Sequence, residues 1–192
     1  LSATVPNVVA EITNSASRIA GPADEIARMF FIVFDRAPDK VLFHAAMDAL
    51  RAGATIEEIC AIALSLTGAS LDTSLNLSNS QFVARLADAM WVVRPSGFSI
   101  QPFVDVLDDG TMTRAQLLAG ALAHDDPFVR YTDKVDTALL YLAIANRQAT
   151  VEELELSANT PELPLIRQIV SQSTPDLLSG APYWTIAGPT LF

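Results

Sequence analysis

Apolar residues recur along the chain with the spacing of amphipathic helices. Between residues 26 and 34 they follow the i, i+3, i+4, i+7, i+8 pattern of one buried helical face: Ile26, Met29, Phe30, Val33 and Phe34. Pro38 ends this segment, because proline disfavours helical geometry at the residue that precedes it. A second amphipathic segment, residues 41–51, leads into Thr55 and Glu58, whose spacing is a capping-box signature for a third helix.

A stretch rich in Ser, Thr, Asn and Leu, residues 68–80, is the expected linker between two helical groups. After the linker, Thr150 and Glu153 form another capping-box signature. The periodicity predicts four more helices, over residues 82–93, 100–107, 113–123 and 128–147. Sustained strand-like alternation is absent apart from a short stretch at residues 184–186. The sequence therefore predicts an all-α fold.

Prolines become frequent after residue 159 and set the expected character of the C-terminal part. They predict short helices and an irregular tail, since proline interrupts helix interiors. The expected organisation has an N-terminal helical unit, a linker, a second helical unit, and a proline-rich tail that packs on the chain itself or on a partner. In order, these cover residues 1–67, 68–80, 81–158 and 159–192.

One motif recurs in the helical segments. Each copy has an aromatic or aliphatic helix, a turn with an arginine, an amphipathic helix, a glycine turn and a further helix. The copies are marked by the arginine and by the threonine that opens the last helix: Arg36 and Thr55, Arg94 and Thr113, and, in a shortened third copy, Arg147 and Thr150. Units of this kind cover their apolar faces by stacking on neighbours, so the sequence predicts a bundle of stacked short-helix repeats.

The first copy resembles a known family. Its segment Phe34-Asp35-Arg36-Ala37-Pro38-Asp39 is followed by an amphipathic helix, Gly53, and Thr55 three residues before Glu58. This pattern is similar to a helical repeat domain of unknown function found in bacterial surface-layer proteins and secreted repeats-in-toxin proteins. That domain is distantly similar to the phycobilisome linker domain. The resemblance implies an extracellular structural or attachment role and brings no catalytic residues with it.

Composition and charge exclude several classes of function. Hydrophobic residues make up 51% of the chain and charged residues 18%, which is not the composition of a disordered protein. A net charge of -10 repels phosphate backbones, so we expect no nucleic-acid partner. No uninterrupted apolar run reaches about 18 residues, so we expect no membrane-spanning helix.

The candidate catalytic side chains do not form a recognisable set. His44 and His124 are the two histidines, and neither belongs to a serine-hydrolase or zinc-protease motif. We expect His44 to be a half-buried, hydrogen-bonded side chain and His124 to cap a helix end. Cys60 lies in an apolar helix, where a thiol behaves as a small buried hydrophobe. The sequence therefore predicts a protein that is not an enzyme and binds no organic cofactor.

Two clusters remain as candidate binding residues. Asp105, Asp108 and Asp109 lie near one turn, and their oxygens suit a hard cation, so they are a candidate calcium site. Turn formation by the same residues is the competing interpretation. In the tail, four large apolar side chains either fold back onto the chain or contact a partner, and we take them as candidate partner contacts: Tyr183, Trp184, Leu191 and Phe192.

These observations favour a non-enzymatic, extracellular or cell-surface structural module. Such a module is a self-assembling subunit of a surface layer, sheath or filament, or an attachment domain for cell-surface polysaccharide. The first alternative is an intracellular linker or adaptor of a larger protein complex, and the second is a small helical enzyme. For all three functions we expect four aromatic residues at equivalent places of the repeats to be largely buried: Phe30, Phe34, Trp91 and Tyr141.

Overall fold

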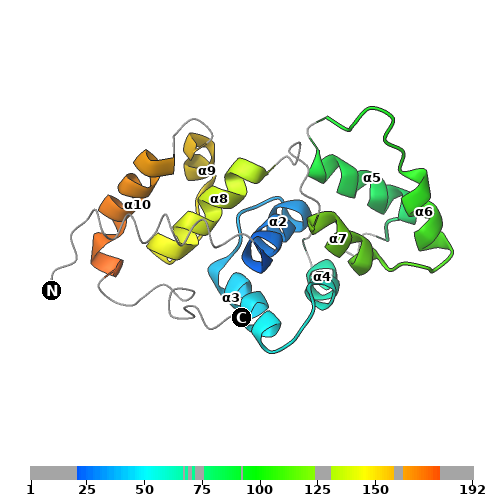
Figure 1. The fold of residues 1–192 in the computed structure, drawn as a ribbon, viewed down its shortest axis with the longest axis horizontal. Coiled ribbons are helices and arrows are strands. Elements are labelled where there is room, and N and C mark those ends of the chain that lie inside the picture. Colours follow the sequence, from blue (N-terminus) through cyan, green and yellow to red (C-terminus); the bar gives the residue numbers. More distant parts are fainter. Residues whose placement is uncertain are drawn as a thin grey trace.

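The computed structural model describes residues 21–66, 68, 71, 76–91, 93–123, 131–157 and 162–177 of the 192-residue chain. Within these ranges the chain forms helices and no strand, which confirms the predicted all-α class. Figure 1 shows α2 (Pro22–Phe34), α3 (Lys40–Arg51), α4 (Ile56–Ser65), α5 (Asn79–Met90), α6 (Gln101–Asp108), α7 (Arg114–Leu122), α8 (Thr132–Leu140), α9 (Val151–Ser157) and α10 (Glu162–Leu177). A π-helical segment, η2 (Tyr141–Ala145), continues α8.

Capping boxes fix the starts of four helices. The pairs are Thr55 with Glu58, Ser78 with Gln81, Thr113 with Gln116, and Thr150 with Glu153. In each, the hydroxyl accepts a backbone N–H at the third helical position, and the longer side chain accepts the N–H of the capping residue. The predicted boxes at Thr55 and Thr150 are confirmed. Ser78 moves the start of α5 to Asn79, earlier than the expected residue 82.

The turn between α2 and α3 is built by two aspartates. Asp35 ends α2 in the left-handed conformation, with φ of 52°, and its N–H bonds to the carbonyl of Phe31. Asp39 begins α3, because its side chain accepts the N–H groups of Val41 and Leu42. Asn146 ends η2 in the same left-handed conformation, with φ of 53°. Asp and Asn tolerate this geometry better than other residues that carry a Cβ.

Helix α2 lies at the centre of the packing. It contacts α3, α4, α5, α7 and α8, and in Figure 1 it lies between α8 and α10 on one side and α5 to α7 on the other. Helix α4 packs on α7, and α10 packs on η2. One continuous cluster of buried apolar side chains runs from Ile26 to Val170 and includes Leu71 and Leu77 of the expected linker. None of the described helices is long and apolar enough to cross a membrane.

The structure refines the expected burial and corrects one expected helix length. Phe30 and Tyr141 are buried as predicted, and Phe34 and Trp91 are partly buried at the ends of their helices, where they pack against the core. The prediction of only short helices beyond residue 159 is wrong, since α10 has 16 residues. Its Pro164 lies in the first turn, where backbone N–H groups have no intrahelical acceptor to lose. The repeat remains a prediction.

Candidate functional site

A pocket of about 290 Å³ opens between α2, α5 and the start of α8. It is lined by Phe31, Ile32, Asp35, Arg85, Asp88, Ala89 and Tyr131. Arg85, Asp88 and Ala89 are spaced i, i+3, i+4 along α5 and therefore share one face of that helix. The pocket combines an apolar floor with two carboxylates, a guanidinium and a phenol.

Tyr131 is held from two sides. Its hydroxyl donates a hydrogen bond to Oδ1 of Asp35 at 2.7 Å, and its ring stacks on Phe31 with 5.2 Å between the ring centroids. Phe31 and Ile32 are both buried in the α2 helix. Asp35 lies in the left-handed conformation that ends α2, with φ of 52°. This wall of the pocket is therefore fixed before any ligand arrives.

The opposite wall carries an ion pair. Arg94 donates from Nε to Oδ1 of Asp88 at 3.1 Å, and its Nη2 donates to the same oxygen and to the carbonyl of Ala84 at 3.3 Å. Arg85 and Asp88 are exposed at the pocket, as is Asp35. The charged residues that line the pocket are Asp35, Asp88 and Arg85, and Arg94 pairs with Asp88 from outside this lining.

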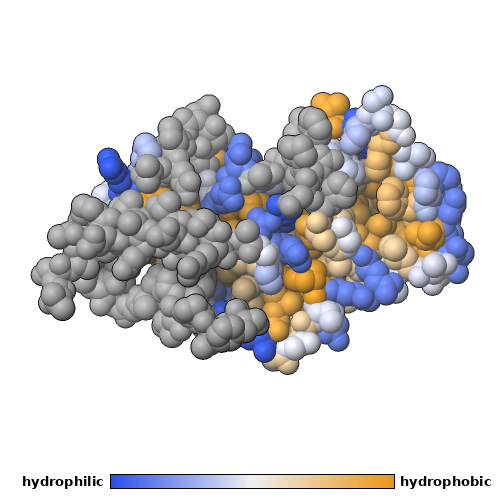
Figure 2. Space-filling model, viewed as in Figure 1, coloured by the Kyte–Doolittle hydropathy of each residue, from blue (hydrophilic) through white to orange (hydrophobic). Residues whose placement is uncertain are grey.

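Exposed apolar side chains form a second candidate surface. Val41 is 72% exposed and Leu42 37% at the start of α3, and Ile62 is 59% exposed on α4, with Leu66 following α4. We call these four residues the α3/α4 surface. Figure 2 shows hydrophobic side chains in the lower part of the view, where α3 and α4 lie, and on the right over α5 and α6. On soluble proteins, exposed apolar residues that form a contiguous patch mark interaction sites.

A row of aromatic rings joins the end of α5 to α6. Phe98 lies 4.8 Å from Trp91 and 6.0 Å from Phe103, measured between ring centroids. Phe103 is 38% exposed, and Val93 in the same connection is 75% exposed. Trp91, which the sequence predicted to be largely buried, is partly buried and packs against both the core and Phe98.

The predicted calcium ligands do not converge. Asp105 accepts a hydrogen bond from Gln101, Asp108 accepts one from Asn79 on α5, and Asp109 accepts the backbone N–H of Thr111. Hydrogen bonds from Thr111 lower the pKa of the Asp109 carboxyl. Among the described residues, no three Asp, Glu, His or Cys side chains are grouped to hold a metal ion. The geometry supports turn formation, and the calcium site stays a prediction.

The other predicted residues are placed as follows. Cys60 is fully buried, as expected, and burial raises the pKa of its thiol to about 12. His44 is half-buried beside Phe43, and burial followed by the charge of Lys40 lowers its pKa. His124 and the tail residues Tyr183, Trp184, Leu191 and Phe192 lie outside the described part of the chain.

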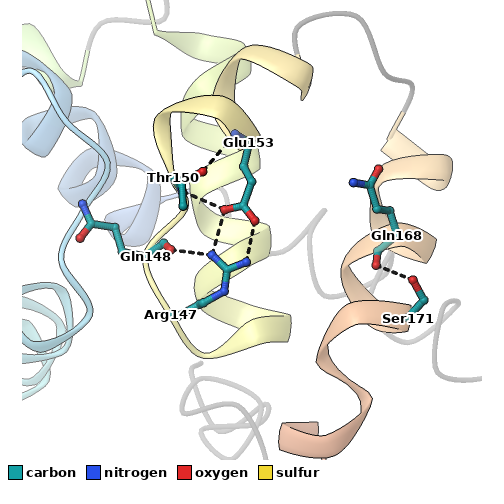
Figure 3. Close-up of polar contacts among 6 residues, drawn as sticks. All are labelled: Arg147, Gln148, Thr150, Glu153, Gln168 and Ser171. Atoms are coloured by element: carbon teal, nitrogen blue, oxygen red, sulfur yellow. Dashed lines mark hydrogen bonds and ion pairs between the residues drawn. The ribbon is translucent and has the colours of Figure 1, made fainter.

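A polar cluster lies at the start of α9. The sequence marked Arg147 as part of the third repeat copy and Glu153 as part of a capping box, but it did not predict the contact between them. Figure 3 shows Arg147 donating to both carboxylate oxygens of Glu153, at 2.8 and 2.6 Å. The hydrogen bonds from Arg147 lower the pKa of Glu153. The guanidinium also lies over the ring of Tyr141, 4.9 Å from its centroid, and burial raises the pKa of that phenol to about 12. Arg147 and Glu153 thus bond to each other and to nearby backbone groups, and these hydrogen bonds fix the turn after η2.

Compared with known protein families, curated proteins and solved structures, the chain matches none of them. The resemblance to the surface-layer and repeats-in-toxin helical domain therefore stays a prediction from the motif around Arg36. What the chain does has to be argued from its own pocket and surfaces.

Proposed function

We propose that the chain is a non-enzymatic extracellular structural module that assembles with further copies of itself, as a subunit of a surface layer, sheath or filament. The observation that carries the proposal is the α3/α4 surface. Val41 and Ile62 keep 72% and 59% of their surface in water. Covering a Val or Ile side chain fully is worth about 1.5–3 kcal/mol, so contact between copies gains free energy at this place.

The α3/α4 surface supports the centre of an interface rather than a whole one. A stable contact between proteins buries about 1,200–2,000 Å² in total, more than four side chains supply. Such a centre is surrounded by polar residues, and here Asp48 and Arg51 of α3 form an exposed ion pair. A module with several such contacts builds an extended assembly from individually modest interactions.

Net charge sets the conditions for assembly. A chain with a net charge of -10 repels its own copies at low ionic strength. Salt screens this repulsion, because the Debye length falls from about 30 Å at 0.01 M to about 3 Å at 1 M. Self-association of this chain is therefore expected to strengthen as salt is added.

The test replaces apolar side chains at the α3/α4 surface. We expect Val41→Ser together with Ile62→Ser to lower the mass measured by light scattering after gel filtration, relative to the unmodified chain. The matched control is Ala45→Ser with Ala61→Ser, which introduces the same residue at two exposed positions of the same helices. Equal association of all three chains, with unchanged circular dichroism, overturns the α3/α4 surface as the contact.

Cell fractionation separates this proposal from the intracellular alternative. A surface subunit is recovered with the cell envelope or the medium, whereas a linker or adaptor is recovered in a cytosolic complex. Recovery in the cytosol alone contradicts the extracellular assignment.

A further inference from the structure

The aromatic row of Trp91, Phe98 and Phe103 lies on the connection from α5 to α6, apart from the α3/α4 surface. We propose that this row binds residues 178–192 of a second copy of the chain. The inference rests on the proposed self-assembly and adds a second contact to it, with a different surface and a named occupant.

Apolar side chains in this connection keep much of their surface in water. Phe103, at one end of the row, is 38% exposed, and Val93 is 75% exposed. Phe98 packs between the rings of Trp91 and Phe103, so the rings form one continuous row. Figure 2 shows the hydrophobic surface over α5 and α6. Exposed apolar residues that form a contiguous patch mark interaction sites.

The row lies in a part of the sequence without charges, which selects the kind of occupant. Residues 95–104 include no Asp, Glu, Lys, Arg or His, and Arg94 before them is paired with Asp88. In a chain with a net charge of -10, copies approach each other with least repulsion where neither carries charge. Burying a charge without a partner is costly, so an uncharged, apolar occupant suits this surface.

The sequence of residues 178–192 has this character. The segment contains no Asp, Glu, Lys, Arg or His, and it holds five large apolar side chains: Tyr183, Trp184, Ile186, Leu191 and Phe192. It also contains Pro182 and Pro189, and extended segments with prolines dock on surfaces lined by aromatic rings. The segment lies outside the described residues, and its composition matches the surface of the row.

The position of α10 favours an occupant from a second copy. Figure 1 places α10 and the pair of α5 and α6 at opposite ends of the long axis. The segment follows α10, which ends at Leu177. At about 3.3 Å per residue it extends up to about 50 Å, which is enough to reach a neighbouring molecule. A contact between opposite ends of two copies is head-to-tail and produces a filament unless it closes into a ring.

Fluorescence anisotropy of a synthetic peptide tests the contact on the full chain. The peptide has the sequence of residues 178–192, with an N-terminal dye and two added lysines for solubility. A peptide of the same composition in scrambled order is the reference. We expect the native order to bind more tightly than the scrambled one. Val93→Ser together with Phe103→Ser should weaken this binding about tenfold.

The matched control is Val151→Ser with Leu156→Ser, which removes two apolar side chains of α9 that are 65% and 61% exposed. Peptide binding that is weakened by the row variant and kept by the control supports the inference. Equal binding by both variants, or no preference for the native order, overturns the row as the site. Self-association is measured by mass without peptide, so a chain that associates but does not bind the peptide contradicts this contact alone.

A disulfide trap tests which copy supplies the segment. Val93→Cys and Thr185→Cys in one chain place one thiol beside the row and one in the segment, while the native Cys60 is fully buried. Under mild oxidation we expect covalent species larger than one chain of 20.6 kDa, and far fewer of them from Val151→Cys with Thr185→Cys. A disulfide that forms only within single chains shows that the segment covers its own row, and it overturns the second copy as the occupant.

Discussion

Gln148 donates a hydrogen bond from Nε2 to the carbonyl oxygen of Ala37 at 2.8 Å, and it thereby joins two turns that are 111 residues apart. Ala37 is buried, and each turn follows a helix that ends in a left-handed residue, Asp35 in one case and Asn146 in the other. The bond holds the connection to α9 against the connection to α3. Both connections carry an arginine over an aromatic ring, Arg36 over Phe34 and Arg147 over Tyr141.

Replacing Gln148 should destabilise the fold more than its half-buried position suggests. Gln148→Ala leaves the buried carbonyl of Ala37 without this donor, and an unpaired buried polar group costs about 1–3 kcal/mol. Urea unfolding measures the loss, with Gln172→Ala on the exposed side of α10 as the control. If Gln148→Ala loses no more unfolding free energy than the control, then water takes the place of the Gln148 amide as donor to the Ala37 carbonyl.

Replacing two phenylalanines of the same helix by alanine should lower the unfolding free energy by different amounts. Phe30 is buried in the core, so Phe30→Ala is expected to cost about 3–5 kcal/mol of unfolding free energy. Phe34 is half-buried and partly covered by the guanidinium of Arg36, so Phe34→Ala should cost about half as much. Equal losses in parallel urea titrations would mean that Phe34 is covered in solution, by another copy or by the tail.

The ion pair of Arg147 and Glu153 predicts a dependence of stability on pH. The folded pKa of Glu153 lies below its ordinary value of 4.5, so the carboxylate stabilises the fold above that pH. This contribution is lost as the pH falls through the folded pKa. Glu153→Gln retains an acceptor for the capping box but lacks the charge.

The difference in unfolding free energy between the unmodified chain and Glu153→Gln should therefore be constant near neutral pH and should shrink below about pH 4.5. Glu152, whose pKa is also lowered, is present in both chains and cancels. A difference that stays the same into the acid range is incompatible with a stabilising charge at Glu153.

Cys60 should be inert in the folded protein. With a pKa of about 12, about one thiol in ten thousand is ionised near pH 8, and the side chain is fully buried. Labelling by Ellman's reagent is expected only at the rate of unfolding and to be rapid in concentrated urea. Rapid labelling of the native chain would show that α4 opens locally at Cys60.

Local sequence signals predicted the helices well, because their causes are local. The capping boxes at Thr55 and Thr150 and the spacing from Ile26 to Val33 act within a few residues of chain. Pro164 did not prevent a long helix, as the sequence had predicted it would. The effect of proline depends on its position, and the first turn of a helix tolerates it.

The pocket could not be predicted, since its residues come together only through packing. Asp35 was visible as part of a turn motif, but Arg85 and Tyr131 reach it because α5 and α8 both pack on α2. Phe34 and Trp91 are less buried than Phe30 and Tyr141 for a related reason: a residue at the end of a helix has fewer neighbours than an equivalent residue within one. The exposed Val41 and Ile62 had the same periodicity as core residues and were not distinguished from them.

The central claim, that the chain works by assembling with itself, is tested most directly by sedimentation equilibrium of the unmodified chain over a range of concentrations at low and high salt. A single chain has a mass of 20.6 kDa. We predict an average mass that exceeds this value, rises with protein concentration and rises further with salt. An average mass of 20.6 kDa at every concentration and in both salts contradicts the account.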